Sequence, residues 1–219
     1  MLESIYRQYE KLLAEVDSEF DRVSRIFSDR MQCRKGCGSC CSQIFHISLI
    51  EAAYISRAVK ALDPAGRREM RDKARAYLAE LTGAEVDEDE DIESHSSRVR
   101  ASVGAKAGRH HIPCPALKDE ACTIYGHRPI IARKYGIPLW NPRNPRVLQA
   151  CELNFRAGEE IDAEGLVEPQ MELEYRWLSL KRDVLDELDL PDLVATVASA
   201  VLFDYEAVVE DRIARETSG

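Results

Sequence analysis

Apolar residues recur every three or four positions along the first part of the chain, as they do on one face of an amphipathic helix. The positions that share this spacing are Leu2, Ile5, Tyr6, Tyr9, Leu12, Leu13, Val16, Phe20, Val23 and Phe27. The pattern predicts a long helix over residues 2–29, with Asp17 and Ser18 marking the place where it could break.

Two further helices follow, and each has recognisable terminal residues. Ser48-x-x-Glu51 is a capping box, and the apolar spacing after it predicts a helix that ends at Asp63. Pro64 then takes the favoured first position of the next helix, which we expect to end at Gly83, the usual kind of terminator.

The chain between the early and late helices lacks a regular period. Residues 84–111 are acidic, then basic and rich in Ser, Gly and Ala, so we expect a flexible loop. Residues 112–151 are rich in proline and cysteine and predict only a short helix from Pro129 to Gly136. The C-terminal part predicts one helix over residues 173–188 and another from Pro191 to about Arg215.

These elements predict a mainly α fold in which helices flank an irregular, cysteine-rich, metal-stapled centre. We expect a single domain over residues 1–219. Its parts are an N-terminal helix (1–30), a cysteine-cluster metal-binding region (31–155) that includes the 84–111 loop, and C-terminal helices (156–219).

The composition and net charge favour some classes of protein over others. The chain is 45% apolar and 32% charged, which is ordinary for a soluble globular protein. Its 30 basic and 39 acidic side chains give a formal net charge of -9, which repels phosphate backbones and disfavours nucleic-acid binding.

Neither a membrane span nor a targeting segment is expected. The longest apolar run, from Leu193 to Phe203, is about half of the roughly 20 residues that a spanning helix needs, so it predicts a buried helix. The first residues, Met1 to Ser4, include a charge and lack the pattern of a secretory signal. We therefore expect a cytoplasmic protein.

The seven cysteines carry the candidate chemistry. They are Cys33, Cys37, Cys40, Cys41, Cys114, Cys122 and Cys151. In a reducing cytosol, clustered cysteines favour metal binding or catalysis over disulfides. Four of them lie within nine residues, and the other three share one later window.

The segment Cys33-x3-Cys37-x2-Cys40-Cys41 has the short spacings that point several thiolates at one ion, with glycines on both sides of Cys37 to allow a tight turn. Adjacent side chains such as Cys40 and Cys41 diverge in regular backbone. They are therefore expected to face different ions, or different corners of one cluster. Seven thiolates also exceed the four of a closed zinc site, which favours two sites or one shared cluster.

These segments resemble a known family. The residues that carry the resemblance are Cys33 to Cys41, Cys114-Pro115-Ala116-Leu117, Cys122-Thr123-Ile124-Tyr125-Gly126-His127-Arg128-Pro129 and Arg133-Lys134-Tyr135. They are similar to those of the YkgJ-like cysteine-cluster proteins, zinc- or iron-chelating proteins named for a CxxCxxCC-type motif. The resemblance implies metal chelation. That family usually has one more cysteine, at the position that Ala132 occupies here, so one candidate ligand is missing.

Enzymes with an iron–sulfur centre are the alternative. Cys33, Cys37 and Cys40 have the spacing of radical S-adenosylmethionine enzymes, but Ser39 replaces the usual aromatic residue, and the following segments predict helices rather than βα units. The cysteine motif is also similar to that of flagellin lysine methylases. Those proteins are longer, and this chain shows no glycine-rich strand-to-helix loop for a methyl donor.

Histidines and arginines are secondary candidates. His110, His111 and His127 lie near the later cysteines and could complete a site, although surface histidines are more common. We expect His46 and His95 to be structural or solvent-facing.

Arg128 and Arg133 sit beside candidate thiolates and could offset their charge, or could simply be exposed on a short helix. Thiolate sites bind zinc, iron and iron–sulfur clusters alike, so zinc or iron remains the expected cofactor. The metal ion is the expected partner.

Overall fold

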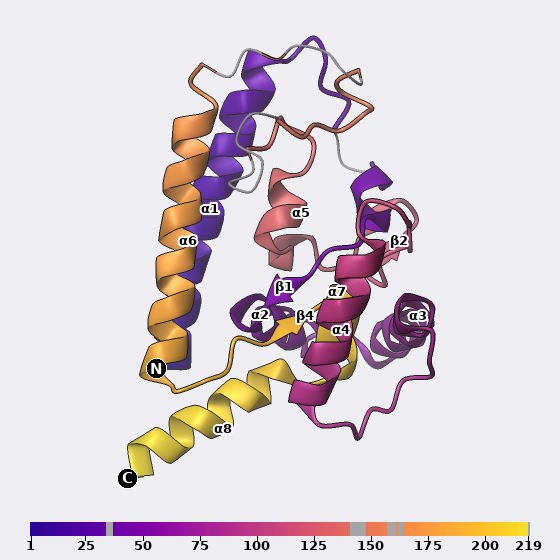
Figure 1. Cartoon of the computed structure of the whole chain (residues 1–219), viewed down its shortest axis with the longest axis vertical. Coiled ribbons are helices and arrows are strands. Elements are labelled where there is room, and N and C mark those ends of the chain that lie inside the picture. The colour runs from indigo at the N-terminus through magenta and orange to yellow at the C-terminus, as the bar shows by residue number, and fades with distance from the viewer. Residues whose placement is uncertain (34–36, 141–147, 157–160, 162–163, 219) are drawn as a thin grey trace.

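Helices make up most of the computed structural model, which describes residues 1–33, 37–140, 148–156, 161 and 164–218 (Figure 1). The α-helices are α1 (Leu2–Ile26), α2 (Leu49–Lys60), α3 (Pro64–Thr82), α4 (Ile92–Lys106), α5 (Ile130–Lys134), α6 (Val167–Glu187), α7 (Val197–Leu202) and α8 (Tyr205–Ser218). The 3-10 helices are η1 (Ser39–Ser42) and η2 (Tyr125–His127). The prediction of a mainly α fold is confirmed.

Strands are short in the part of the chain that the structure describes. β1 (Ile47–Ser48) pairs antiparallel with β4 (Val194–Ala195), and β2 (Leu117–Lys118) pairs antiparallel with β3 (Ala121–Cys122). The first pair joins the segment before α2 to the segment before α7. The second pair is a hairpin that carries one of the cysteines.

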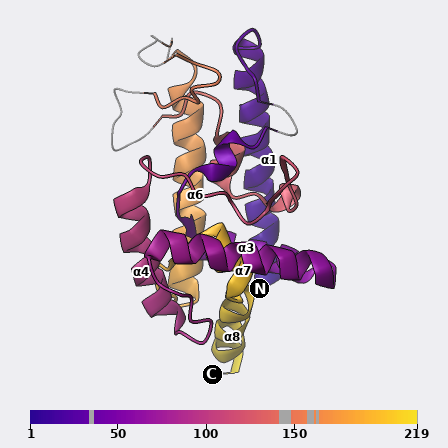
Figure 2. The same cartoon turned by 90° about the vertical axis from the view of Figure 1, so that its right-hand side faces the viewer.

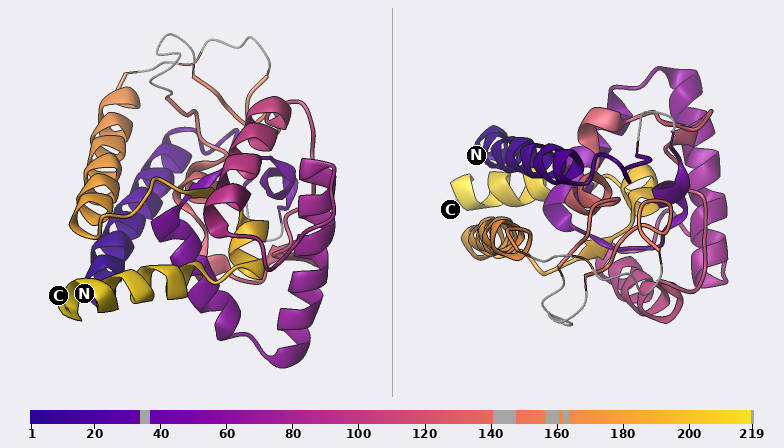
Figure 3. Two further views of the ribbon diagram at one scale, coloured as in Figure 1. Left: turned by 60° about the horizontal axis from the view of Figure 1, so that its bottom comes forward. Right: turned by 90° about the horizontal axis from the view of Figure 1, so that it is seen from above.

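The long helices α1 and α6 lie side by side and run in opposite directions, with α5 beside α1 (Figure 1). Helices α2 and α7 lie at the centre, and α3 and α4 cover the other side. Figure 2 shows α3 running across the direction of α1 and α6. Seen from above, α1, α6 and α8 gather on one side and α3 and α4 on the other, while both termini lie at the same end (Figure 3).

The Tyr9 side chain packs α1 against α2 and α6. This side chain is fully buried, and its ring packs 5.4 Å from Tyr54 of α2 and 5.4 Å from Trp177 of α6, measured between centroids. Burying aromatic area on this scale stabilises the three-helix junction by several kcal/mol, on the order of 2–3 per ring. The expected break at Asp17 and Ser18 does not occur, because Val16 on the same face is also buried.

The capping box at the start of α2 is present and does more than cap. One oxygen of Glu51 accepts hydrogen bonds from the backbone N–H and the hydroxyl of Ser48, at 2.8 and 2.9 Å. The other oxygen accepts the backbone N–H of Ile130, at 3.0 Å. Burial raises the pKa of Glu51, and these hydrogen bonds work in the opposite direction. One buried carboxylate therefore joins the start of α2 to the start of α5.

The prediction of a flexible loop over residues 84–111 is wrong for the second half of this segment, which forms α4. The Asp91 carboxylate caps this helix by accepting the N–H of Ser94 at 2.9 Å. Its buried face is formed partly by His95 and Ser96, which are polar, so the face gives no apolar period. The Ser96 hydroxyl accepts the backbone N–H of Val194 in β4 at 2.8 Å.

The segment from 191 to 215 also differs from the prediction of one helix. Val194–Ala195 form β4, α7 follows, and the helix stops at Phe203 before α8 begins. Thr196 caps α7 by accepting the N–H of Ser199 at 3.0 Å, which fixes the start of the helix after the strand. The helix before this segment, α6, begins at Val167, earlier than expected. Among the described residues, no helix has both the length and the apolarity that crossing a membrane requires.

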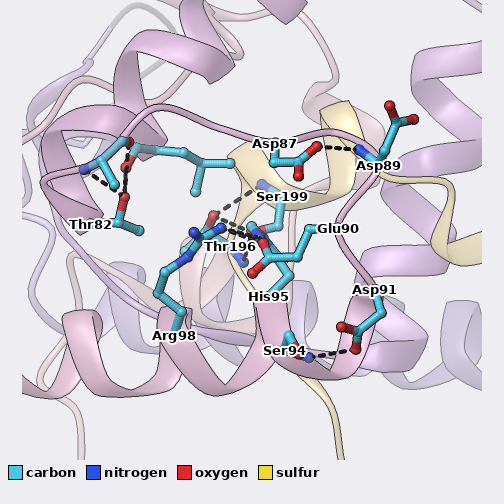
Figure 4. Close-up of polar contacts among 12 residues, drawn as sticks. Thr82, Asp87, Asp89, Glu90, Asp91, Ser94, His95, Arg98, Thr196 and Ser199 are labelled. Atoms are coloured by element: carbon cyan, nitrogen blue, oxygen red, sulfur yellow. Dashed lines mark hydrogen bonds and ion pairs between the residues drawn. The ribbon is translucent and has the colours of Figure 1, made fainter.

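His95 joins α4 to α7 in the buried polar cluster of Figure 4. Its Nε2 lies 3.0 Å from the Ser199 hydroxyl, and its Nδ1 lies 3.4 Å from a carboxylate oxygen of Glu90. Glu90 alone would favour a charged ring, but Glu90 is already paired with Arg98. Burial and the positive charge of Arg98 lower the pKa of His95 to about 4. His95 is therefore neutral and structural.

We expect the fold to lose stability between pH 6.5 and pH 4 because of His95. Above pH 6.5 the ring is neutral in both states. Below it, the unfolded chain takes up a proton that the folded chain excludes until about pH 4, so the free energy of unfolding falls. The loss should reach about 3 kcal/mol, since one pKa unit is worth about 1.4 kcal/mol.

Urea unfolding of the parent and of His95→Gln at pH 7 and pH 4.5 measures this. The variant should show a smaller acid loss than the parent, while His110→Gln, which changes an exposed histidine, should behave as the parent does. The same acid loss in all three proteins would contradict the assignment.

Candidate metal centre

All seven cysteines line one cavity of about 430 Å³. They reach it from three parts of the chain: the segment between α1 and α2, the segment of the β2–β3 hairpin, and the turn at Cys151. The lining cysteines are Cys33, Cys37, Cys40, Cys41, Cys114, Cys122 and Cys151. The structure thus brings together every cysteine that the sequence singled out. Thiols are donors that suit both zinc and iron.

Backbone hydrogen bonds bring the first two segments together. The N–H of Cys114 donates to the carbonyl of Cys41 at 2.6 Å, and the N–H of Ile112 donates to the carbonyl of Ser42 at 3.0 Å. Cys40 and Cys41 lie in η1, whose tight turn holds both side chains on the cavity. The two cysteine motifs of the sequence are therefore direct neighbours in space.

The hairpin places the next thiol. Cys122 in β3 pairs with Leu117 in β2, so the hairpin folds Cys122 back toward Cys114. Its two-residue turn, Asp119 and Glu120, has positive φ angles of 48° and 59°, as the turns that suit the twist of a two-residue hairpin require. This turn also places the Glu120 side chain on the cavity wall.

Asn154 connects the third segment to the first, and sequence reasoning missed it. Its side-chain oxygen accepts the backbone N–H of Gln32 at 2.8 Å. Its Nδ2 donates to the Cys33 sulfur at 3.2 Å and to the carbonyl of Gly136 at 2.7 Å. Its own N–H donates to the carbonyl of Cys151 at 2.9 Å. A single buried amide therefore holds Cys33 next to the turn that carries Cys151.

Gly136 packs against the Cys33 sulfur at a position where a side chain would clash with it. Its φ angle is +118°, and a Cβ atom at this position would lie 2.5 Å from the Cys33 sulfur. The chain after α5 can approach the thiol this closely only because the side chain is absent.

Charge and burial define one group of thiols around Cys33. Burial raises the pKa of Cys33, and the hydrogen bond from Asn154 acts in the opposite direction. The neighbouring thiols Cys151, Cys37 and Cys40 raise it further, in that order. We call Cys33, Cys37 and Cys151 the Cys33 set.

A second group surrounds Cys41. The Cys40 thiol donates a hydrogen bond to Cys41, which lowers the pKa of Cys41 and raises that of Cys40. Burial raises the pKa of Cys114 to about 12, and the charges of Cys122 and Cys40 add to this. We call Cys41, Cys114 and Cys122 the Cys41 set. Cys40 acts on thiols of both sets.

The thiols line one cavity, but their present positions do not form a metal-binding site. Within the described residues, no three histidine, cysteine, aspartate or glutamate side chains converge closely enough to hold one ion. All seven cysteines line the same cavity, so a ligating arrangement requires their side chains to move toward common points within it.

The histidines near the cysteines have other contacts. No histidine is among the described residues that line the cavity. The Nδ1 of His111 lies 3.4 Å from the Gln43 amide, and the His127 ring packs 4.6 Å from that of Tyr54. Of the two arginines, Arg133 is buried and ion-paired with Asp17, whereas Arg128 is half-buried and lines the cavity.

Comparison with known protein families matches the region that contains these cysteine segments. A family model described as "CxxCxxCC: Putative zinc- or iron-chelating domain" matches residues 32–151, more than half of the chain. The chain belongs to the CxxCxxCC family. The matched region of this family member begins beside Cys33 and ends at Cys151, so it contains every cysteine. Searches of curated proteins and of solved structures found no match. Membership in the CxxCxxCC family supports metal binding as the general function.

A second chemical arrangement lies outside the metal centre. Ser199, His95 and Glu90 have the order of a hydrolytic triad, but the first two are fully buried and neither is among the described residues that line the cavity. The Ser199 hydroxyl is also occupied by the N–H of Thr196, at 3.1 Å. This cluster is structural, because no substrate can reach the serine.

Replacing Asn154 tests how the cavity is assembled. We expect Asn154→Leu to lower the free energy of unfolding by about 2–4 kcal/mol, because several buried polar groups lose their partner at once. Chemical denaturation measures the change, with Gln149→Leu as the control at an exposed amide in the same region. Equal, small losses in both variants would show that Asn154 does not hold the segments together.

Proposed function

We propose that this chain binds zinc or iron in the cavity, with the thiolates of the Cys33 set, the Cys41 set and Cys40 as ligands. The observation that carries the proposal is that all seven thiols line one cavity, although they come from three separate segments. Cysteines that served only as small core residues would be distributed among the packed helices instead. The family description supports the same conclusion.

The number of thiols fits two ions that share one ligand. A closed tetrahedral site takes four ligands, so two separate sites need eight thiolates. If one thiolate bridges the two ions, seven suffice. We place the bridge at Cys40, because its charge acts on Cys33 of one set and on Cys114 of the other. The Cys33 set would then complete one ion and the Cys41 set the other.

Metal binding should close the cavity and release protons. Burial raises the pKa values of Cys33, Cys114 and Cys122, so these thiols must lose protons when they bind a metal. Binding therefore weakens as the pH falls. The ions would also draw the thiols together, which turns part of the binding free energy into stability of the irregular segments.

The enzyme alternatives gain no support from the comparisons. Radical S-adenosylmethionine chemistry also requires a run of βα units. The strands found in the described residues are two residues long and form two separate antiparallel pairs. Chelation is therefore the function that the geometry favours.

Metal analysis of the purified protein tests the proposal. Protein prepared anaerobically and in air should be compared for zinc, iron and acid-labile sulfide. We expect about two ions per chain. Zinc would be present in both preparations without sulfide, whereas an iron–sulfur centre would bring sulfide and be lost in air. Protein that contains neither metal in both preparations would contradict the proposal.

Serine substitutions test the sharing of Cys40. We expect Cys114→Ser to lose the ion of the Cys41 set and Cys151→Ser to lose the ion of the Cys33 set, so that each retains about one ion. Cys40→Ser should lose more metal than either, because both ions depend on its sulfur. Equal metal content in the three variants would rule out a shared ligand.

Ala132 offers the complementary test, because it lines the cavity from α5. We expect Ala132→Cys to bind metal about tenfold more tightly, since an eighth thiol removes the need for a bridge. Competition with a chromophoric chelator measures the affinity. Ala101→Cys adds a thiol at an exposed position of α4 and serves as the control. An unchanged or weaker affinity in Ala132→Cys would show that position 132 does not reach the metal.

A further inference from the structure

Arg128 is a cation of the cavity wall that has no acidic partner in the part of the chain that the structure describes. Its guanidinium lies 3.7 Å from the centroid of the Tyr125 ring, and its Nε donates to the Tyr125 carbonyl at 3.1 Å. Within the described residues, no carboxylate lies within ion-pair distance of this guanidinium. The two terminal nitrogens are therefore available to the cavity that Arg128 lines.

In contrast to Arg128, the nearby Arg133 has a structural role. It pairs with Asp17 of α1, and its other nitrogens donate to the carbonyls of Gly126 and Arg128 at 2.5 and 2.9 Å. Every part of this guanidinium has a protein partner. Its contacts also fix the backbone of the turn that carries Arg128, so the position of Arg128 at the cavity is well defined.

The charge of Arg128 acts on one side of the cavity. Arg128 follows Cys122 on the same segment, and the hairpin of that segment is joined to Cys114 and Cys41. The N–H of Leu117 donates to the carbonyl of Cys114 at 3.0 Å, and the N–H of Cys114 donates to the carbonyl of Cys41. The positive charge of Arg128 also favours the thiolate forms of Cys41 and Cys122. On the other side, Cys33 receives a hydrogen bond from the neutral amide of Asn154 instead. The two groups of thiols therefore have different electrostatic surroundings.

This difference matters because thiolate sites accumulate negative charge. A divalent ion with four thiolates carries a net charge of −2, and two ions that share one of seven thiolates carry −3. Such charge is costly in a partly buried site unless a cation offsets it. A guanidinium is suited to this role, because it remains charged at every relevant pH and is weakly hydrated.

We propose that Arg128 makes the two metal positions unequal by stabilising the ion held by the Cys41 set, without ligating it. Arg128 acts here as a positioning charge and Tyr125 holds its guanidinium in place. This inference rests on the proposed metal-binding function. It assigns the tighter ion to the Cys41 set and the more exchangeable ion to the Cys33 set.

The test measures each ion separately in the whole chain. Cys151→Ser isolates the ion of the Cys41 set, and Cys114→Ser isolates the ion of the Cys33 set. Arg128→Gln is introduced into each background, and zinc affinity is measured by competition with a chromophoric chelator at low and high salt. Arg109→Gln, which removes an exposed arginine outside the cavity, is the matched control.

We expect Arg128→Gln to weaken zinc binding about tenfold in the Cys151→Ser background and about twofold or less in the Cys114→Ser background. The large effect should shrink at high salt, because screening weakens partly exposed charge interactions. Arg128→Lys should restore part of the affinity, which a purely structural role would not predict. Arg109→Gln should change neither background.

Three results would overturn the inference. An equal effect of Arg128→Gln on both ions would mean that Arg128 does not distinguish them, and an effect on neither would mean that its charge does not reach the metal. Loss of binding in Arg128→Lys together with loss of helix content would show a structural role. A parent chain that binds no zinc or iron refutes the proposed function itself, which is a separate outcome recorded before any variant is made.

Discussion

The buried carboxylate of Glu51 is the interaction on which the cysteine centre depends. Its two oxygens accept hydrogen bonds from Ser48, where the first cysteine segment enters α2, and from Ile130, where the second segment enters α5. A buried carboxylate without these donors would cost several kcal/mol. Glu51 thus fixes the C-terminal end of the first cysteine segment relative to the C-terminal end of the second.

The cavity needs backbone that no helix can supply. Thiols from one helix face would lie along a line, whereas a metal needs ligands from several directions. The turn η1, the hairpin with its positive φ angles and the bare backbone of Gly136 supply those directions. Asn154 then closes the third side. The irregular regions that carry little periodicity are therefore the ones that carry the chemistry.

The parts that the sequence predicted well have local causes. The capping box of α2 and the left-handed Gly83 at the end of α3 act on neighbouring residues, so a single sequence suffices to find them. The helix α4 was missed because His95 and Ser96 are buried through partners that are distant in the chain. Asn154 was missed for the same reason: one amide in an aperiodic segment looks like any other until Cys33 and Gly136 are placed beside it. The cysteines themselves were identified by their spacing, but the contacts that place Cys41 beside Cys114 and Cys33 beside Asn154 required the three-dimensional arrangement.

If all seven thiols face one metal centre, bound metal should protect every one of them from alkylation. Metal-loaded and chelator-treated protein would be exposed to iodoacetamide, and the modification rate of each cysteine followed by mass spectrometry. We expect bound metal to slow the modification of all seven cysteines together, and removal of the metal to expose all seven. Rates that are the same with and without metal, at all or most of the cysteines, would contradict this expectation.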